Sequence, residues 1–208
     1  MPSSKASTLI LLLLAMLFIV VLCGIYYPLL SAPNFLLNFD DEQLVLPLQN
    51  IQTLSDYLAA KHELKIVDQA PLRDLSFWLD IQGGINFHGH NFALWILILL
   101  VFYAILRQLQ ISPFYALAAT SLFGLHPASA DSVAWISARK HLLSFLFILL
   151  ATLTWLKVLA RPGQDRSSAN HQHPHLTLHF PLCLTLFFYL CANLTWPINL
   201  RWPLLAIT

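Results

Sequence analysis

The chain has 208 residues, of which 58% are hydrophobic and only 10% are charged, and its mean hydropathy is +0.67. This composition excludes an ordinary soluble domain and indicates a polytopic α-helical membrane protein, because only helices and closed barrels satisfy their backbone hydrogen bonds in lipid. The near-neutral balance of eleven basic and ten acidic residues gives no sign of nucleic-acid binding. We therefore expect an all-α fold that forms a single membrane domain over residues 1–208.

The first apolar run covers about residues 9–30 and is long enough to cross a bilayer as one helix. Lys5 precedes it, so a cleaved signal peptide is the alternative. The run is too long for the apolar part of such a peptide, and Leu30, Ser31 and Ala32 form a poor cleavage site. We expect an uncleaved first transmembrane helix.

A polar excursion over residues 31–90 follows and holds eight of the ten acidic residues. Within it, residues 44–64 and 72–79 mix apolar and polar side chains at helical spacing, which predicts short amphipathic helices lying on the membrane. The pair Gly83 and Gly84 marks the return of the chain to lipid. We expect an external loop built from short surface helices.

Four further apolar runs lie at about 92–106, 111–125, 142–159 and 180–194, which gives about five transmembrane helices in all. If each run crosses once, one side holds Lys5, Arg107 and the loop that carries Lys157, Arg161 and Arg166, and the positive-inside rule makes that side cytoplasmic. The acidic excursion and residues 126–141 then share the other side. We expect a bacterial inner-membrane protein with a cytoplasmic N-terminus and a periplasmic acidic loop.

Two polar stretches on the non-cytoplasmic side are the candidates for chemistry. The first is FDDE at 39–42, where the carboxylates of Asp40 and Asp41 come shortly after the first helix. Adjacent carboxylates at the edge of a low-dielectric region repel each other, and this arrangement is typical of a general base. The alternative is an acidic loop start that is exposed to solvent.

The second stretch is LHPASADSVAWISARKHLLS at 125–144, which is dense in polar and aromatic residues. Pro127 fits a helix start, and Asp131, Trp135 and Arg139 then recur at a spacing of four residues, which predicts one helix face. Guanidinium binds phosphate bidentately, so the pattern favours recognition of a lipid phosphate. The alternative is an interfacial anchor, because Trp, Arg and Lys commonly lie at membrane boundaries.

A run of four histidines near the C-terminal end suggests a metal site, because imidazole binds zinc and copper. No helix or strand is expected to fix their positions, and Pro174 interrupts the spacing. We therefore favour a solvated loop on the cytoplasmic side. The residues are His171, His173, His175 and His179.

Taken in order, these stretches resemble the membrane half of the TMTC-type (transmembrane and tetratricopeptide-repeat) O-mannosyltransferases and their bacterial relatives. That family belongs to the GT-C class of polyprenyl-phosphate-sugar-dependent glycosyltransferases. Residues 125–144 look like its HP-x3-[ED]-SVAWIS-x-RK-x-LLS signature, and FDDEQLVL at 39–46 resembles its Asp-Asp block. PLRDLSFWLD at 71–80 and FHGHN at 87–91 are similar to two further segments.

The resemblance implies a GT-C-like fold and transfer of a sugar from a polyprenyl phosphate to a hydroxyl of a protein or glycan. It makes Asp40 or Asp41 the base that deprotonates the acceptor, with membrane lipid and a lipid-linked sugar as ligands. It assigns no residue to a metal, and a divalent cation is compatible with it. The residues that it places around the donor phosphate and sugar are His126, Asp131, Arg139, Lys140, His88 and Asn91.

A second hypothesis is a non-catalytic, shortened relative that acts as a membrane subunit of a larger complex. The chain departs from the family pattern at Ala70, Trp95 and Trp196, and we expect only about five spans with no appended repeats. These departures favour the subunit, whereas Asp40, Asp41 and the arginine favour the enzyme. A transporter is disfavoured, because the apolar runs hold few charges and show no matched pair of broken helices.

Overall fold

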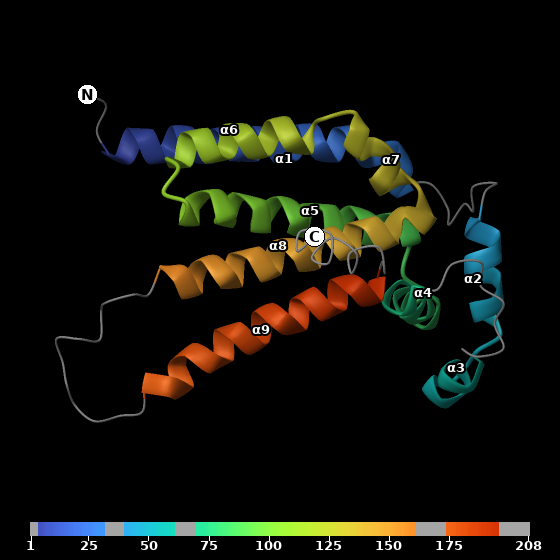
Figure 1. The fold of residues 1–208 in the computed structure, drawn as a ribbon. Helices are drawn as coiled ribbons and strands as arrows, with labels where there is room; N and C mark the ends of the chain where they lie inside the picture. The colour runs from blue at the N-terminus through green and yellow to red at the C-terminus, as the bar shows by residue number, and fades with distance from the viewer. Residues whose placement is uncertain (1–3, 32–39, 61–69, 161–173, 196–208) are drawn as a thin grey trace, which may run out of the picture.

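The structure of the chain is a computed structural model that describes residues 4–31, 40–60, 70–160 and 174–195, with the backbone alone at 4, 5, 60 and 174–180. In these ranges the chain forms helices and no strand, so the predicted all-α fold is confirmed. Five helices lie lengthwise beside one another (Figure 1). They are α1 (Ser4–Ser31), α5 (Phe87–Gln108), α6 (Pro113–Gly124), α8 (Arg139–Leu159) and α9 (Pro174–Thr195).

Three of the described helical segments are long and apolar enough to cross a membrane: Ala6–Ser31, Phe87–Gln108 and Ile136–Leu159. The run predicted at 111–125 forms α6, whose 12 residues extend about 18 Å at 1.5 Å per residue. That length is shorter than the roughly 30 Å hydrocarbon core of a bilayer. The run predicted at 180–194 lies in α9 (Pro174–Thr195), of which the part with described side chains, Pro181–Thr195, is a shorter apolar segment. The structure therefore supports three spanning helices, and the count of five stays a prediction.

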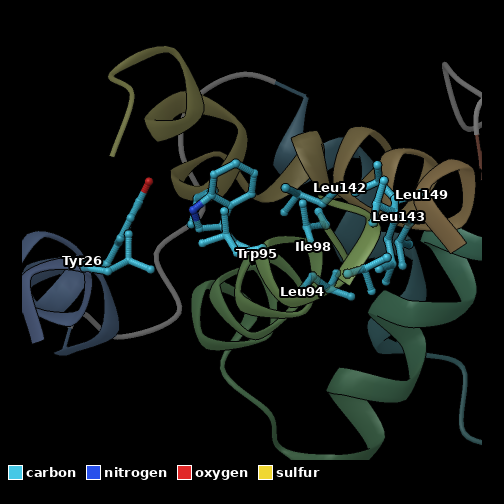
Figure 2. Packing of buried hydrophobic residues seen from close by; sticks show 13 residues of the cluster. Tyr26, Leu94, Trp95, Ile98, Leu142, Leu143 and Leu149 are labelled. Atoms are coloured by element: carbon cyan, nitrogen blue, oxygen red, sulfur yellow. The ribbon is translucent and has the colours of Figure 1, made fainter. Parts of the chain in front are cut away.

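The core of the bundle forms where α5 and α8 pack together, with α9 on the other side of α8. Helix α1 reaches this core through residues at a spacing of four, namely Phe18, Leu22 and Tyr26. Most other apolar side chains of α1 are exposed. Because lipid tails are as apolar as these side chains, exposure of this kind suits a helix that faces a bilayer. Figure 2 shows Tyr26 at one end of the cluster, opposite the leucines of α8.

Three short helices form a cap at one end of the bundle (Figure 1). They are α2 (Asp41–Gln49), α3 (Leu54–Ala60) and α4 (Pro71–Gly83), in the region where surface helices are predicted. The cap has its own hydrophobic cluster, in which Leu44, Leu48 and Phe77 are fully buried. Burial of Tyr57 in this cluster, with the Asp74 carboxylate as a second cause and Arg73 opposing both, raises the pKa of its hydroxyl to about 12.

The return from the cap to the bundle uses residues suited to a sharp turn. Gly84 has a φ of 62°, a left-handed conformation that favours glycine, and its N–H donates to the last carbonyls of α4. Asn86 then caps α5, because its side-chain oxygen accepts a hydrogen bond from the Gly89 N–H at 2.9 Å. The predicted break at Gly83 and Gly84 therefore corresponds to a turn that aims α5 into the bundle.

The prediction of one continuous helix face from Asp131 to Arg139 is wrong. Helix α7 (Ala128–Ala134) ends before Trp135, whose backbone is extended, and a 3-10 turn (Ile136–Ala138) precedes α8. The break is compensated by side chains, because the carbonyl of Trp135 accepts from Asn91 and the N–H of Ser137 donates to Asp41. As a result Asp131 is exposed, whereas Arg139 is fully buried.

We predict that the close approach of α6 to its neighbours makes Gly124 sensitive to substitution. A Cβ at this residue would lie 2.8 Å from Cζ of Phe18 and 3.0 Å from Cδ1 of Leu99, whereas nothing lies within 4 Å of a Cβ at Gly24. Gly124→Ala should lower the free energy of unfolding by roughly 1–3 kcal/mol through overpacking. Gly24→Ala should leave it unchanged or raise it by up to about 1 kcal/mol, because alanine favours helix.

Thermal unfolding of both variants in detergent checks this. Equal stability of the two variants would contradict the packing that places α6 against α1 and α5.

Candidate functional site

The site is organised around the buried guanidinium of Arg139, the first residue of α8, which has no exposed surface. Its Nε donates to Oδ1 of Asn91 at 2.8 Å, and one terminal nitrogen donates to Oδ2 of Asp80 at 2.5 Å. The other terminal nitrogen donates to the carbonyl of Phe87 at 3.0 Å. The ring of Phe77 lies beneath the group, 4.5 Å from its central carbon. One side chain thus binds α4 and α5 to the start of α8.

Asn91 extends this network to the broken segment between α7 and α8. Its amide nitrogen donates to the carbonyls of Trp135 at 3.1 Å and Val133 at 3.4 Å, while its oxygen accepts from Arg139. The residue is fully buried. Asn91 therefore contacts both the break and the arginine, whereas the assignment of these two residues to donor binding stays a prediction.

The negative charge of this network comes from Asp80, near the end of α4. One carboxylate oxygen pairs with Arg139, and the other lies 2.6 Å from Nδ1 of His90. Only 1% of the Asp80 side chain is exposed. Removing one partner of such a buried pair costs about 3–5 kcal/mol, because the other charge is left without compensation. The pair therefore fixes the cap on the bundle.

The two aspartates of FDDE lie at the junction of the cap with the segment before Arg139. Asp41 is fully buried, and its Oδ1 accepts from the N–H of Ser137 at 2.8 Å and from the Ser137 hydroxyl. Its Oδ2 and the Oδ1 of Asp40 are also shielded from solvent, yet neither accepts a hydrogen bond from any described residue. An unsatisfied buried oxygen costs about 1–3 kcal/mol, so two together call for a functional explanation.

The other residues assigned to donor binding are distributed around this centre. His88 lies in the first turn of α5 and is buried, and Lys140 is half-buried beside Arg139. His126 is exposed between α6 and α7, and its Nδ1 accepts from the N–H of Ala128. Asp131 is exposed on α7. The structure thus brings Asp41, Asn91 and Arg139 into one hydrogen-bonded region. It places His126 and Asp131 outside that region.

A metal centre finds no support in the described part of the chain. Across residues 4–31, 40–60, 70–160 and 174–195, no group of three or more His, Cys, Asp or Glu side chains could hold an ion. The histidine run lies outside the described side chains, since His171 and His173 precede α9 and the side chains of His175 and His179 are not described.

The residues that bind Arg139 and Asp41, namely Asp80 and Ser137, are not apparent from the sequence. In the sequence Asp80 is one of eight acidic residues in the excursion, and its place in the last turn before Gly83 and Gly84 does not distinguish it. Ser137 carries no chemical signal in sequence, and its role arises because the chain bends at Trp135. Arg139 is a cation in an apolar helix and requires a buried anion. Its position alone therefore indicates that one of the acidic residues pairs with it.

Comparisons with protein-family models, with curated proteins and with solved structures each found no match to this chain.

We predict that Arg139 is required for stability. Arg139→Ala leaves Asp80 buried with the half-exposed His90 and should lower the free energy of unfolding by about 3–5 kcal/mol. Lys157→Ala on the same helix removes an exposed cation and should change it by less than about 1 kcal/mol. Thermal unfolding in detergent distinguishes them, and a loss at Arg139 no larger than that at Lys157 would exclude the structural role.

Proposed function

We propose that the chain is a GT-C-like glycosyltransferase, or the N-terminal half of one, that uses a polyprenyl-phosphate sugar as donor. The observation that carries the proposal is the pair of shielded carboxylate oxygens, Oδ2 of Asp41 and Oδ1 of Asp40, which no described residue satisfies. They lie where the cap meets the segment 125–144 that resembles the signature of the family. A hydroxyl from an acceptor would supply the missing donor.

In this mechanism the acceptor hydroxyl attacks the anomeric carbon of the sugar. The new bond forms between that oxygen and the carbon, while the bond from the carbon to the phosphate oxygen breaks and the polyprenyl phosphate leaves with the electron pair. The hydroxyl proton passes to Asp41, whose other oxygen is held by Ser137. General-base assistance of this kind contributes about 10²–10⁴-fold to the rate.

Arg139 acts in this proposal as a positioning residue. Its hydrogen bonds to Asp80, Asn91 and Phe87 hold the turn that carries Ser137, and Ser137 in turn orients Asp41. The negative charge of the leaving phosphate is then compensated by a cation other than Arg139. The candidate is Lys140, the next residue in the chain. The N-terminus would lie on the cytoplasmic side of a bacterial inner membrane. The cap and the bound acceptor would lie on the periplasmic side.

One observation favours the second candidate, a non-catalytic membrane subunit. Each nitrogen of the Arg139 guanidinium already donates to a partner inside the chain, so the residue that looked most suited to a donor phosphate is engaged in the fold. In that case the same network would hold a rigid cap for binding to another membrane protein.

The proposed base predicts a specific loss of sugar transfer. Asp41→Asn and Asp40→Asn should reduce transfer at one or both positions by about 10²–10⁴-fold. Glu42→Gln changes a neighbouring carboxylate that is exposed to solvent, and it should keep the wild-type rate. The assay follows release of polyprenyl phosphate from a set of short-chain polyprenyl phosphate hexoses by the full chain in vesicles.

Each variant is first compared with wild type by thermal unfolding, so that loss of fold is separated from loss of chemistry. Wild-type activity that survives in both aspartate variants would remove the base. No release by wild type from any hexose donor, together with co-purification of a membrane protein, would favour the subunit.

A further inference from the structure

A groove runs between α1 and α6, and none of its lining residues takes part in the mechanism above. Figure 1 shows the two helices side by side, with the start of each at the end of the bundle opposite the cap. Two adjacent hollows of about 420 and 360 Å³ form the groove, and Phe114 lines both. One wall follows α1 from Ser7 to Val21, and the other follows residues 112–125. The groove therefore starts at the end of the bundle farthest from the proposed site.

The lining of this groove has the polarity of an amphiphile. Along most of its length the side chains are apolar, and Ser121 is the polar exception in the hollow nearer the cap. Three hydroxyl-bearing residues, Ser7, Thr8 and Ser112, line the hollow at the end opposite the cap. The wall from Ser7 to Val21 extends about 21 Å at 1.5 Å per residue. The hydrocarbon of one leaflet is about 15 Å thick, half of the bilayer core, so the groove is long enough for one acyl chain.

A cation is held beside the hydroxyl end of the groove. Arg107, in the last turn of α5, donates a hydrogen bond from its guanidinium to the carbonyl of Ile111. The next residue in the chain is Ser112, which lines the groove. Arg107 is exposed, and a guanidinium has five N–H donors, of which this hydrogen bond uses one. The other donors are therefore available to an anion at the mouth of the groove.

The charges of the described side chains are divided between the two ends of the bundle. The acidic ones belong to α2, α3, α4 and α7 or to Asp40 just before α2, all at the end with the cap (Figure 1). At the opposite end, Arg107 and Lys157 lie exposed in the last turns of α5 and α8. Among the residues whose side chains are described, none is acidic at that end. The groove therefore opens at a surface whose described charges are positive.

From these observations we propose that the groove binds an anionic phospholipid from the leaflet opposite the cap. Its phosphate accepts hydrogen bonds from Arg107 and from the hydroxyls of Ser7 and Ser112, and one acyl chain lies between α1 and α6. Guanidinium binds phosphate oxygens through parallel hydrogen bonds, and basic pockets between membrane helices bind anionic headgroups. This lipid is not the sugar donor, because its headgroup lies at the other end of the bundle from Asp41, and its binding requires no chemical step.

The test measures lipid binding to the full chain in detergent by native mass spectrometry. The probes are dipalmitoyl phosphatidylglycerol, dipalmitoyl phosphatidylcholine and dihexanoyl phosphatidylglycerol. The first should bind about fivefold or more tightly than the second, because one basic residue near an anionic headgroup is worth about this factor. It should bind about tenfold or more tightly than the third, because burial of each methylene contributes about fourfold.

Arg107→Gln tests the headgroup end of the site. It removes the cation and should abolish the preference for phosphatidylglycerol over phosphatidylcholine. Lys157→Gln is the matched control, because it removes an exposed cation at the same end of the bundle that does not line the groove, and it should keep the preference.

Leu14→Trp tests the acyl-chain end, because Leu14 lines the groove and a larger side chain would fill it. It should weaken binding of both dipalmitoyl lipids about tenfold or more. Leu13→Trp changes an exposed leucine of the same helix outside the groove and should leave binding unaltered. Thermal unfolding of each variant separates loss of fold from loss of binding. Asp41→Asn should bind lipid as wild type does, so this test is independent of the proposed base.

A preference for phosphatidylglycerol that depends on Arg107, together with weakened binding in Leu14→Trp, would support the site. Equal affinity for the two dipalmitoyl lipids, an equal loss of preference in Arg107→Gln and Lys157→Gln, or unchanged affinity in Leu14→Trp would overturn it.

Discussion

The buried pair of Arg139 and Asp80 is the interaction on which the rest of the structure depends. It lies between two separate hydrophobic clusters, one within the lengthwise helices and one within the cap. Hydrophobic packing alone does not specify how these two clusters are oriented relative to each other. A charged group with fixed donor directions does, because each hydrogen bond of the guanidinium has to meet an acceptor on a particular helix.

This constraint also explains why the chain bends where it does. A continuous helix through 128–159 would satisfy the backbone locally, yet the chain breaks at Trp135 and takes partners from Asn91 and Asp41 instead. The break turns Arg139 inward and positions Ser137 against Asp41. The acidic pair of the cap and the polar stretch before α8 therefore meet because of the arginine network. The same arrangement shields the two carboxylate oxygens of the proposed site from solvent.

Much of the helical architecture could be predicted from sequence, because apolar runs, Pro71 and Pro113 at helix starts and the Gly84 turn are local signals. The proximity of FDDE to 125–144 could be predicted, because the topology expected from the basic residues puts both stretches on one side of a membrane. The break at Trp135 could not, because a four-residue spacing favours a continuous helix and the compensating contacts come from residues about 44 and 96 positions away. For the same reason the sequence favours a phosphate as the partner of Arg139, although its anion, Asp80, lies 59 residues earlier in the chain.

The most direct test of the central claim is a double-mutant cycle between Arg139 and Asp80, measured as thermal and denaturant unfolding of the full chain in detergent. The single variants Arg139→Met and Asp80→Leu each leave one buried charge without compensation, whereas the double variant leaves none. The account predicts that the double variant is more stable than either single variant, with a coupling energy of about 3 kcal/mol or more. Additive losses, with the double variant the least stable, would show that the pair does not hold the cap on the bundle.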